Sequence, residues 1–556
     1  MSVISVVLGG FGASATRPEM LTSALIVGAL SAAVLYYMVY SWKRRRMYAL
    51  AAKIPGPTGL PVIGNVFDVV GDTEETVRKT MAQFRQYQPT YKYWLGPLLL
   101  VALTDPRDLE IVLNNYKYTD KSHFYNVFHP LGGQGVFNAA GDKWRRNRKI
   151  IAPAFNFNFL VQFVTIFHAM AMRLVGKMKA RADGQSFDSY KLVELCTLDA
   201  IALTAMGVDV NAQDDDNSEW IRAIRRCFQI TRERLVKPWL LPDATFYLTR
   251  DAKDQQKCLD IVNKFAHEVI SRKKAEYRKA KAELDADPVA SKAAAHEREQ
   301  SRLRQDDDED IGVRKKQTFL ELLIERSESE DGCALTDVEL RDEVVTLLIA
   351  GQDTTATDNC FNLLMLALHQ DVQEAVHQEL VDIMGEDPTT CPTYNDLNQM
   401  KHLERVIKET LRLYPSAPFI GRDLDHELDV TDYRLPAGCT VLLGLYGTHR
   451  LAEYWPEPDK FDPDRFLPER SVGRHPYAFV PFSGGPRNCV GQKYAMLQMK
   501  TILSTVIRHF QILPGKDCES MDKFRLQVDF SMTVAGGHNI RLVPRYAGLP
   551  ERMRSL

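Results

Sequence analysis

The sequence predicts a mainly α-helical fold with small β-sheets, preceded by a single transmembrane helix. Apolar residues recur at helical spacing through most of residues 155–274, and a long apolar helix is predicted at 337–369. Only the short segments 91–95 and 98–103, split by Gly96-Pro97, predict a strand pair. An uncharged stretch near the N-terminus, long enough to cross a bilayer, accounts for the transmembrane helix.

The composition is that of an ordinary globular protein. The 556 residues are 45% apolar and 26% charged, with a net charge of −2, and this balance points to no nucleic-acid partner. The nine cysteines are scattered and form no C-x-x-C pair. This argues against a disulfide framework or a zinc site and fits a reducing compartment. The chain is long enough to enclose a cofactor, although its length bounds the number of domains only weakly.

Residues 21–42 are predicted to be a transmembrane signal anchor. The stretch 21–40 carries no charge, and as a helix it spans roughly the 30 Å core of a bilayer. Lys43-Arg44-Arg45-Arg46 follows at once, which places the C-terminal side in the cytoplasm by the positive-inside rule. We expect a lumenal N-terminus at residues 1–20 and a globular body that faces the cytosol at the endoplasmic reticulum membrane. A cleaved signal peptide is the alternative, but its basic residues would precede a shorter apolar run.

A stiff connection is predicted between this anchor and a single large domain at residues 62–556. The connection, residues 43–61, contains the basic run and then Ile54-Pro55-Gly56-Pro57-Thr58-Gly59-Leu60-Pro61. Its prolines cannot lie inside a helix, so this part is expected to be a non-helical hinge.

Within the large domain, a charged insertion is predicted at about residues 272–316. The segment is rich in Ala, Lys, Glu and Arg and includes Asp306-Asp307-Asp308-Glu309-Asp310. It has too few large apolar residues to bury a core, so we expect it to be exposed and partly disordered. A partner-binding role for it, in a membrane-tethered interaction protein, is an alternative.

Residues 141–149 open a basic helical segment. Trp144 and Arg148 lie at positions i and i+4, so they share one face of the helix. The positive charge beside them comes from Arg145, Arg146 and Lys149. These three form either a docking surface for an acidic protein or an ordinary solvated charge run.

The long apolar helix at 337–369 is interrupted by the polar run Ala350-Gly351-Gln352-Asp353-Thr354-Thr355. A buried acid and buried hydroxyl groups inside such a helix are costly unless they serve a purpose. Ala350 and Thr354 share a face, and two small residues there leave room for a small ligand beside the helix. Asp353 and Thr354 are suited to carry protons to such a ligand. The alternative, that the threonines only back-bond within the helix, explains neither the acid nor Gly351.

The most informative stretch is the loop 482–491, Phe-Ser-Gly-Gly-Pro-Arg-Asn-Cys-Val-Gly, which ends where a helix is predicted to begin. Its cysteine is suited to be the thiolate ligand of a haem iron, because backbone N–H groups and the helix dipole stabilise the negative sulfur. Gly485 and Gly491 would let the backbone pass close to a porphyrin, and Arg487 supplies a cation for a haem propionate. A buried structural cysteine is the alternative, but it explains neither the glycines nor the arginine.

The spacing F-x-x-G-x-R-x-C-x-G resembles the cysteine-ligand motif of the cytochromes P-450. The run 350–355 is similar to the A/G-G-x-D/E-T-T motif of that family, and its landmarks follow in family order from Pro55 to Met496. The resemblance implies a cytochrome P-450 fold, a haem b cofactor with Cys489 as the axial metal ligand, and a monooxygenase that uses O2 on a hydrophobic small molecule. It also implies that electrons come from NADPH through a separate flavoprotein reductase, with cytochrome b5 as an additional donor.

The same resemblance gives roles to the other motif residues. Cofactor contacts are implied for Trp144, Arg148, Ala350, Gly351, Arg422, Phe482, Gly485, Arg487 and Gly491, and catalytic proton transfer for Asp353 and Thr354. Glu409 and Arg412, at i and i+3 before Pro415, would alone be a common surface ion pair. With Arg465 they match the Glu-Arg-Arg triad of the family, which locks the haem-binding core and does no chemistry.

Finer matches look like animal family 4 of the cytochromes P-450, which acts on long aliphatic chains. They are His449-Arg450, Tyr454-Trp455-Pro456-Glu457-Pro458, Phe461-Asp462-Pro463 and Gly491-Gln492-Lys493-Tyr494-Ala495-Met496. The charged insertion, with Trp94-Leu95-Gly96 and Ile151-Ala152-Pro153-Ala154-Phe155, looks most like the insect subfamily that makes cuticular hydrocarbons from long-chain aldehydes.

We therefore expect oxidative decarbonylation of a long-chain aldehyde to a hydrocarbon. Terminal hydroxylation of fatty acids and oxidation of hormones or xenobiotics are the alternative reactions. A non-catalytic haem protein is the alternative class, which the acid and hydroxyl of Asp353-Thr354 disfavour.

One position departs from family 4. In most members a glutamate precedes the Gly-x-Asp-Thr-Thr run and is esterified to a haem methyl group, whereas this chain has Ala350. A methyl side chain cannot form that ester, so the haem is predicted to be bound without a covalent link. Without that link, the substrate is expected to be oriented less strictly for attack at the end of its aliphatic chain.

Overall fold

The computed structural model describes residues 17–60, 62–69, 72–286, 317–328 and 335–545. Within these residues the protein is mainly helical with small sheets, so the predicted fold class is confirmed. The predicted lumenal segment, residues 1–20, lies mostly outside the described residues.

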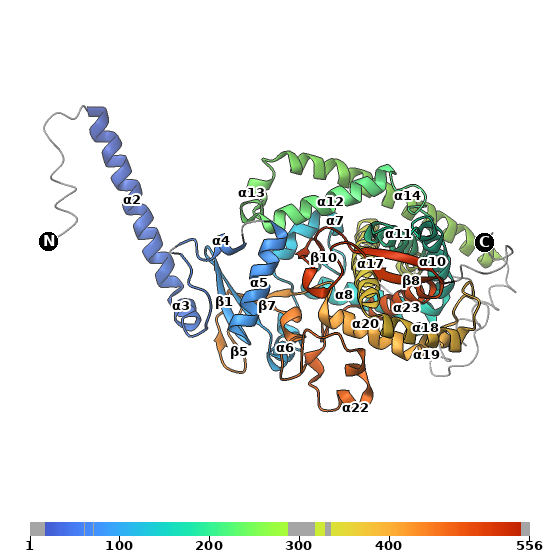
Figure 1. Cartoon of the computed structure of the whole chain (residues 1–556). Coiled ribbons are helices and arrows are strands. Elements are labelled where there is room, and N and C mark those ends of the chain that lie inside the picture. The colour runs from blue at the N-terminus through green and yellow to red at the C-terminus, as the bar shows by residue number, and fades with distance from the viewer. Residues whose placement is uncertain (1–16, 61, 70–71, 287–316, 329–334, 546–556) are drawn as a thin grey trace.

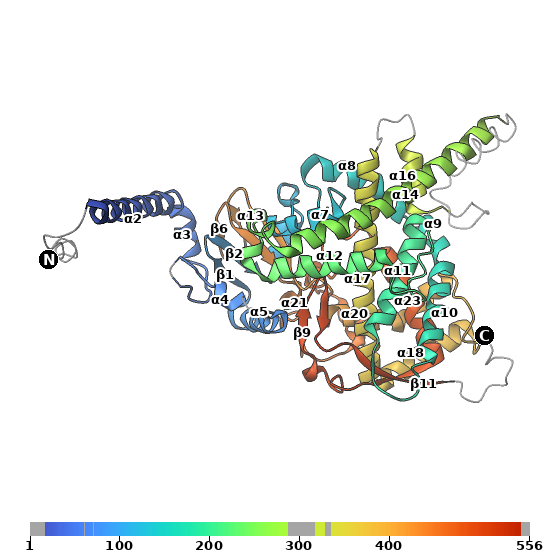
Figure 2. The same cartoon turned by 90° about the horizontal axis from the view of Figure 1, so that it is seen from above.

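The N-terminal helix α2 (Arg17–Lys43) projects away from the globular body in both views (Figures 1 and 2). It contains one stretch, Leu25–Lys43, that is apolar and long enough to cross a membrane, with a mean hydropathy of 1.6. None of this stretch is buried against the rest of the protein. The helix is therefore a candidate membrane span at the place that the sequence predicted.

A short helix, α3 (Arg45–Ala51), follows α2 and holds its base against the body. Met47, Ala51 and Ile54 are buried in the same apolar cluster as residues of the largest sheet. Arg46 forms an ion pair with Glu427, which is far away in the sequence. The chain after Ile54 is not helical, as its prolines predicted.

The largest sheet has the strand order β1-β2-β7-β4 and contains the predicted strand pair. Its strands are β1 (Thr90–Leu95), β2 (Leu98–Leu103), β7 (Thr440–Leu443) and β4 (Ile420–Asp423). β2 and β7 are parallel, and the other two pairs are antiparallel. Arg422 belongs to β4, so the sheet brings this residue to the interior, where it is 2% exposed.

The main core surrounds the long helix α17 (Asp337–Leu368), which runs through the middle of the body in Figure 2. Thr336 begins it with a capping box, because its hydroxyl accepts from the Glu339 N–H while the Glu339 carboxylate accepts from the Thr336 N–H. α10 (Val164–Lys179), α11 (Tyr190–Met206) and α23 (Gln492–His509) pack into the same core. Because α17 is buried on all sides, its apolar residues form a continuous run instead of one stripe.

Two helices lie side by side over this core, α12 (Glu219–Val236) and α14 (Arg250–Ala286) (Figures 1 and 2). Residues 272–286, the first part of the predicted charged insertion, continue α14 and are mostly exposed. Lys273 and Lys274 in this part form ion pairs with Glu321 and Asp337, which fixes its first turns. The remainder of the predicted insertion, residues 287–316, lies outside the described residues.

The remaining helices and strands connect these layers. The helices are α4 (Val66–Val69), α5 (Thr73–Tyr87), α6 (Pro106–Leu113), α7 (His129–Gly132), α8 (Gly141–Ile151), α9 (Phe157–Leu160), α13 (Asp243–Phe246), α16 (Phe319–Ser327), α18 (Gln370–Met384), α19 (Tyr394–Gln399), α20 (Lys401–Leu413), α21 (Leu445–Thr448) and α22 (Pro468–Ser471). The strands are β3 (Phe187–Asp188), β5 (Leu428–Asp429), β6 (Arg434–Leu435), β8 (Phe510–Pro514), β9 (Leu526–Val528), β10 (Met532–Val534) and β11 (Asn539–Pro544). They form a three-stranded sheet, β3-β11-β8, and two pairs, β10-β9 and β5-β6.

Candidate haem-thiolate site

A cavity of about 590 Å³ lies between α17 and the loop that carries Cys489. Its wall also includes residues of α5, α8 and β4, which are far apart in the sequence. The predicted site residues on this wall are Trp144, Arg148, Ala350, Gly351, Thr354, Arg422, Phe482, Arg487, Cys489 and Gly491. Asp353 and Gly485 lie outside the wall. The fold thus brings most of the predicted site residues to one space.

Cys489 stands at the end of a tightly turned loop. Ser483 and Gly485 have positive φ angles of 60° and 67°, and the Cys489 N–H donates to the Phe482 carbonyl over 2.9 Å. α23 begins directly after the loop. The side chain of Cys489 is exposed to the cavity, so its sulfur is available to a ligand there.

The surroundings of the Cys489 sulfur act on its pKa in both directions. Burial raises the pKa of the thiol and has the largest effect, and the Gly491 backbone N–H and the cations Arg148 and Lys121 oppose this rise. A thiolate is the form that binds a metal. Within the described part of the chain, no group of three or more His, Cys, Asp or Glu side chains is placed to hold a metal ion. A single thiolate can bind a metal whose other ligands come from a macrocycle.

The structure corrects the reason given for Gly485. A side chain at this residue would collide with the backbone carbonyl of Leu113, at the end of α6. Glycine is therefore needed where the loop packs on α6. At Gly491, an added Cβ would lie 3.8 Å from the Phe155 ring and 3.9 Å from the Cys489 sulfur, which is ordinary contact.

Three basic side chains on the cavity wall interact with one another: the half-buried Lys121 and the buried Arg422 and Arg487. Burial and the two arginines lower the pKa of Lys121 well below its usual range, and burial and Arg422 lower the pKa of Arg487 to about 10. The Nε of Arg487 is buried without a hydrogen-bond partner. Asp120, which is 54% exposed and 3.7 Å from Arg487, compensates this charge only weakly. The cluster fits a bound dianion, such as the two propionates of haem.

Trp144 and Arg148 lie beside this cation cluster, on one face of α8 as predicted. The Arg148 guanidinium donates to the Asn488 carbonyl over 2.8 Å and to Asn488 Oδ1 over 2.6 Å. Trp144 is 5% exposed, and the Arg487 guanidinium lies 4.9 Å from the centre of its ring. α8 thus fixes two of the predicted cofactor-binding residues against the cysteine loop.

Asp353 and Thr354 are neighbours in sequence but have different surroundings. Thr354 lies on the cavity wall, where its hydroxyl donates to the Ala350 carbonyl over 2.7 Å. Asp353 lies behind the wall, where Tyr190 donates to Oδ1 and the other oxygen is buried without a partner. Burial raises the pKa of Asp353 to about 6, while the Ser531 and Tyr190 hydroxyls oppose the rise. Ser531 also lies on the cavity wall.

The sequence analysis missed a second acid on α17, Asp358. This residue lies on the cavity wall one turn after Thr354, and its Oδ1 is buried without a partner. Burial raises the pKa of Asp358 to about 8, with Ser416 opposing the rise. The acid is therefore mainly protonated at neutral pH and can donate a hydrogen bond. Its spacing of four residues from Thr354 was the available signal.

The structure brings Glu409, Arg412 and Arg465 together. Arg412 donates from Nε and Nη2 to the two Glu409 oxygens over 2.7 and 2.8 Å, and both side chains are 0% exposed. Arg465 Nε lies 3.4 Å from Glu409 Oε1. Arg412 also donates to backbone carbonyls of residues 449 and 458. The pair is therefore deeply buried, unlike the surface ion pair considered as its alternative.

The basic residues on the outer face of α8 are partly neutralised. Arg145 pairs with Asp142 at 2.5 Å, and Arg146 pairs with Glu339 at 2.8 Å. Lys149 is exposed. The segment therefore presents less uncompensated positive charge than its sequence suggested.

Comparisons with known proteins agree with this site. Residues 54–535 match the family model described as Cytochrome P450. The chain is 36% identical over 554 residues to Cytochrome P450 4g15 of Drosophila melanogaster, covering 92% of this chain and 95% of the relative. It is 36% identical to Cytochrome P450 4c21 of Blattella germanica, with 89% and 94% covered. It is 34% identical to Cytochrome P450 4V2 of Homo sapiens, with 86% and 87% covered. The chain therefore belongs to the cytochrome P450 family, as a monooxygenase of family 4.

Proposed function

We propose that this monooxygenase oxidises long-chain aliphatic substrates, and that its preferred reaction is oxidative decarbonylation of a long-chain aldehyde to a hydrocarbon. The observation that carries the proposal is the chemical character of the cavity wall away from Cys489. Apolar side chains dominate there, including Val77, Phe84, Leu100 and Leu235. An aliphatic chain gains free energy when it leaves water for such a wall.

A neutral head group suits this wall better than a carboxylate. Arg232 is a cation on the cavity wall that is not among the residues predicted to bind the cofactor. Its Nη1 lies 3.1 Å from Asp529 Oδ1. Because this ion pair already neutralises the guanidinium, a fatty-acid carboxylate would have to compete with Asp529 for it. The pairing therefore supports an aldehyde as substrate over a fatty acid.

The haem cofactor is proposed to be bound by Cys489 and by the wall cations. When bound through a thiolate, haem supplies the oxygen-activating chemistry, because the sulfur donates electron density that favours O–O cleavage. Lys121, Arg422 and Arg487 would hold its propionates together with Trp144 and Arg148. Ala350 offers no carboxylate for an ester, so we propose haem b without a covalent link.

Thr354 and Asp353 are proposed to supply protons within the cavity. The Thr354 hydroxyl donates to the Ala350 carbonyl, so it has to turn toward the cavity to donate there. Asp353, with a pKa of about 6, can exchange a proton near neutral pH, and its route to the cavity passes Ser531. Glu409, Arg412 and Arg465 are proposed to hold the core around the cysteine loop and to take no part in the chemistry.

The source of electrons is proposed to be NADPH, through a separate flavoprotein reductase and with cytochrome b5 as an additional donor. The apolar helix α2 and the basic run after it support a single-pass anchor in the endoplasmic reticulum membrane, with the catalytic domain at 62–556 facing the cytosol.

The deciding experiment compares substrates. The full-length enzyme and reductase would be incubated with NADPH and, in parallel, a long-chain aldehyde or the fatty acid of the same length, and the products identified by mass. We expect a hydrocarbon one carbon shorter than the aldehyde, and no product from Cys489→Ser. A hydroxy acid without any shortened hydrocarbon would overturn the aldehyde proposal and leave the monooxygenase assignment intact.

A further inference from the structure

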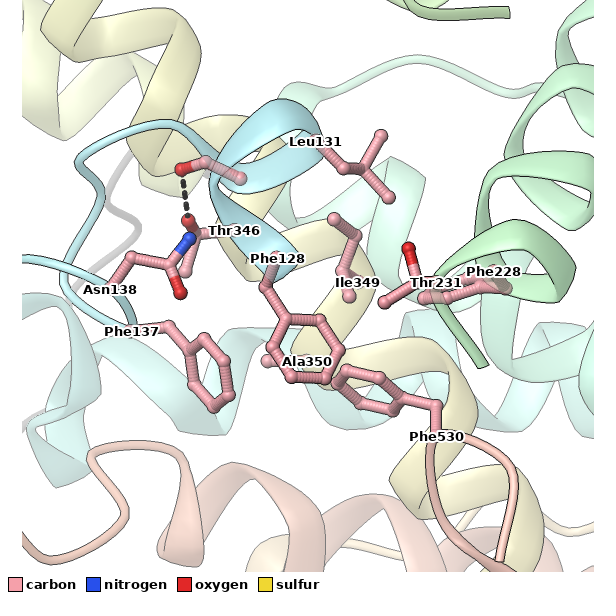
Figure 3. A pocket seen from close by; sticks show the side chains of 11 residues that line it. Phe128, Leu131, Phe137, Asn138, Phe228, Thr231, Thr346, Ile349, Ala350 and Phe530 are labelled. Carbon is pink, nitrogen blue, oxygen red and sulfur yellow. Dashed lines mark hydrogen bonds between the residues drawn. The ribbon is translucent and has the colours of Figure 1, made fainter. Parts of the chain in front are cut away.

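A small side chamber adjoins the large cavity beside Ala350. Its volume is about 20 Å³, enough for one water-sized group. Figure 3 shows the rings of Phe128, Phe137 and Phe530 around Ala350, with the Asn138 amide between Thr346 and Phe137. The three rings, Ala350 and Thr346 also lie on the wall of the large cavity, so a molecule in the cavity can reach the chamber.

The chamber contains a hydrogen-bond acceptor without a donor. Asn138 is 8% exposed, and its Oδ1 is buried with no hydrogen-bond partner. Its Nδ2 donates to the Gly133 carbonyl over 3.1 Å. This bond fixes the orientation of the amide, because turning it over would bring two oxygen atoms together. A buried acceptor left unpaired is costly, so the site favours an occupant that donates a hydrogen bond.

The other polar groups of the chamber do not satisfy Asn138. The Thr231 hydroxyl donates to the Cys227 carbonyl over 2.9 Å, and the Thr346 hydroxyl donates to the Gly132 carbonyl over 3.2 Å. Both hydroxyl protons are therefore engaged, and the oxygens offer lone pairs. No charged side chain lines the chamber within the part of the chain that the structure describes. These properties suit a small, neutral donor.

We propose that this chamber is a binding subsite for the hydroxyl group of a long-chain alcohol, which donates to Asn138 Oδ1 while its aliphatic chain lies in the large cavity. A methyl end has no donor, and an aldehyde or carboxylate end offers only acceptors, so the subsite selects alcohols among chains of similar length. The inference depends on the proposed function for the aliphatic class of ligand. It adds hydroxylated chains to the molecules that the enzyme binds.

The test compares two isomers, dodecanol and methyl undecyl ether, which have the same heavy atoms but differ in the O–H donor. Each would be titrated into the haem-loaded, detergent-solubilised full-length protein, with binding followed by equilibrium dialysis. We expect dodecanol to bind about tenfold more tightly, because one buried acceptor gains its partner. Asn138→Leu should remove this preference while the ether binds as before.

The loss of preference in Asn138→Leu could also come from a folding defect of the loop at Asn138, so a second variant is needed that does not change this loop. Thr231→Ile fills the chamber from α12 and leaves that loop unchanged, so it should also abolish the preference for the alcohol. Equal binding of the two isomers by the unmodified protein would overturn the subsite alone and would indicate water as its occupant. A preference that survives Thr231→Ile would overturn it as well. Failure of both isomers to bind would overturn the aliphatic substrate class and the subsite with it.

Discussion

The Tyr190 hydroxyl donates a 2.8 Å hydrogen bond to Asp353 Oδ1 and holds this acid behind the cavity wall. The contact crosses from α11 to α17, the two helices that pack along each other at the centre of the body. The pKa of Asp353 is raised to about 6, because burial disfavours the carboxylate more than Tyr190 and Ser531 stabilise it. The stability of the protein should therefore depend on this residue.

Replacing Asp353 with Asn should stabilise the fold at neutral pH. A folded-state pKa above the ordinary value of 3.8 means that folding favours the protonated acid, so its stabilising effect is complete below about pH 4 and is lost as the pH rises through about 6. A rise of the Asp353 pKa from 3.8 to about 6 corresponds to about 3 kcal/mol. Thermal unfolding of Asp353→Asn and the unmodified protein should thus diverge between about pH 4 and pH 6. Asp432→Asn, at an exposed acid, is the control, and a difference that is independent of pH would contradict the expectation.

Thr354→Ala should uncouple NADPH consumption from product formation. The variant loses the hydroxyl on the cavity wall but keeps the haem and substrate contacts, and general-acid help is typically worth about 10²- to 10⁴-fold. The measurement is the ratio of product formed to NADPH consumed, together with haem content. Thr357→Val, a buried threonine of α17 that is not on the cavity wall, serves as the matched control. Unchanged coupling in Thr354→Ala would refute the role in proton supply.

Cys489→Ser should remove the thiolate signature of the haem. Because a hydroxyl is a weaker donor than a thiolate, the reduced carbon-monoxide complex should lose its thiolate-type absorption band. Cys439→Ser tests the effect of losing a buried cysteine elsewhere, on the sheet side of the molecule. Persistence of the thiolate-type band in Cys489→Ser would exclude this sulfur as the ligand.

Lys121→Met should weaken haem retention by about tenfold, because a hydrogen bond to a charged group is worth about 1.5–3 kcal/mol. The change removes one of the three wall cations that interact with one another, and burial keeps the other two partly desolvated. Transfer of haem to an excess of an acceptor protein would measure the effect. Lys117→Met, at an exposed lysine nearby in sequence, should leave haem transfer unchanged. Equal rates of haem transfer from the two variants would show that Lys121 does not contribute to haem binding.

Arg412→Leu should destabilise the fold by about 3–5 kcal/mol, because it leaves the Glu409 carboxylate buried without its main partner. Arg412 also donates to the His449 and Pro458 carbonyls, and those bonds are lost too. Denaturant unfolding gives the free energy directly. Arg434→Leu, which removes a half-exposed arginine from a surface ion pair, should cost less than about 1 kcal/mol. Similar losses in the two variants would show that burial of the Arg412 pair does not matter.

The sequence predicted the elements better than the directions of side chains. The helix predicted at 337–369 is observed as Asp337–Leu368, because a long apolar run is a local signal. The strand pair followed from the turn between its halves. The cysteine loop was recognisable because its glycines, arginine and cysteine stand at fixed spacings. These features depend on residues that are close in sequence.

What the sequence could not predict depends on contacts between distant segments. Asp353 faces Tyr190 on another helix, and no local pattern reveals that partner. Lys121 lies on the cavity wall but belongs to a loop. In the sequence, nothing distinguishes it from a lysine at the surface. The continuation of α14 through residues 272–286 was missed because its ion pairs lie with Glu321 and Asp337, which come after the insertion.

The packing of α3 on the sheet has a consequence for encounters with other membrane proteins. A linker of flexible residues would let the body tumble freely above its anchor, so a partner in the same bilayer would meet it in every orientation. Met47, Ala51 and Ile54 are buried in the body instead, so α3 fixes the base of α2 to the body and restricts this tumbling. Once α2 is in a bilayer, diffusion is confined to a plane, and the face that the enzyme presents within this plane is set largely by rotation about one axis. A redox partner anchored in the same membrane would then search fewer orientations before it reaches a productive one.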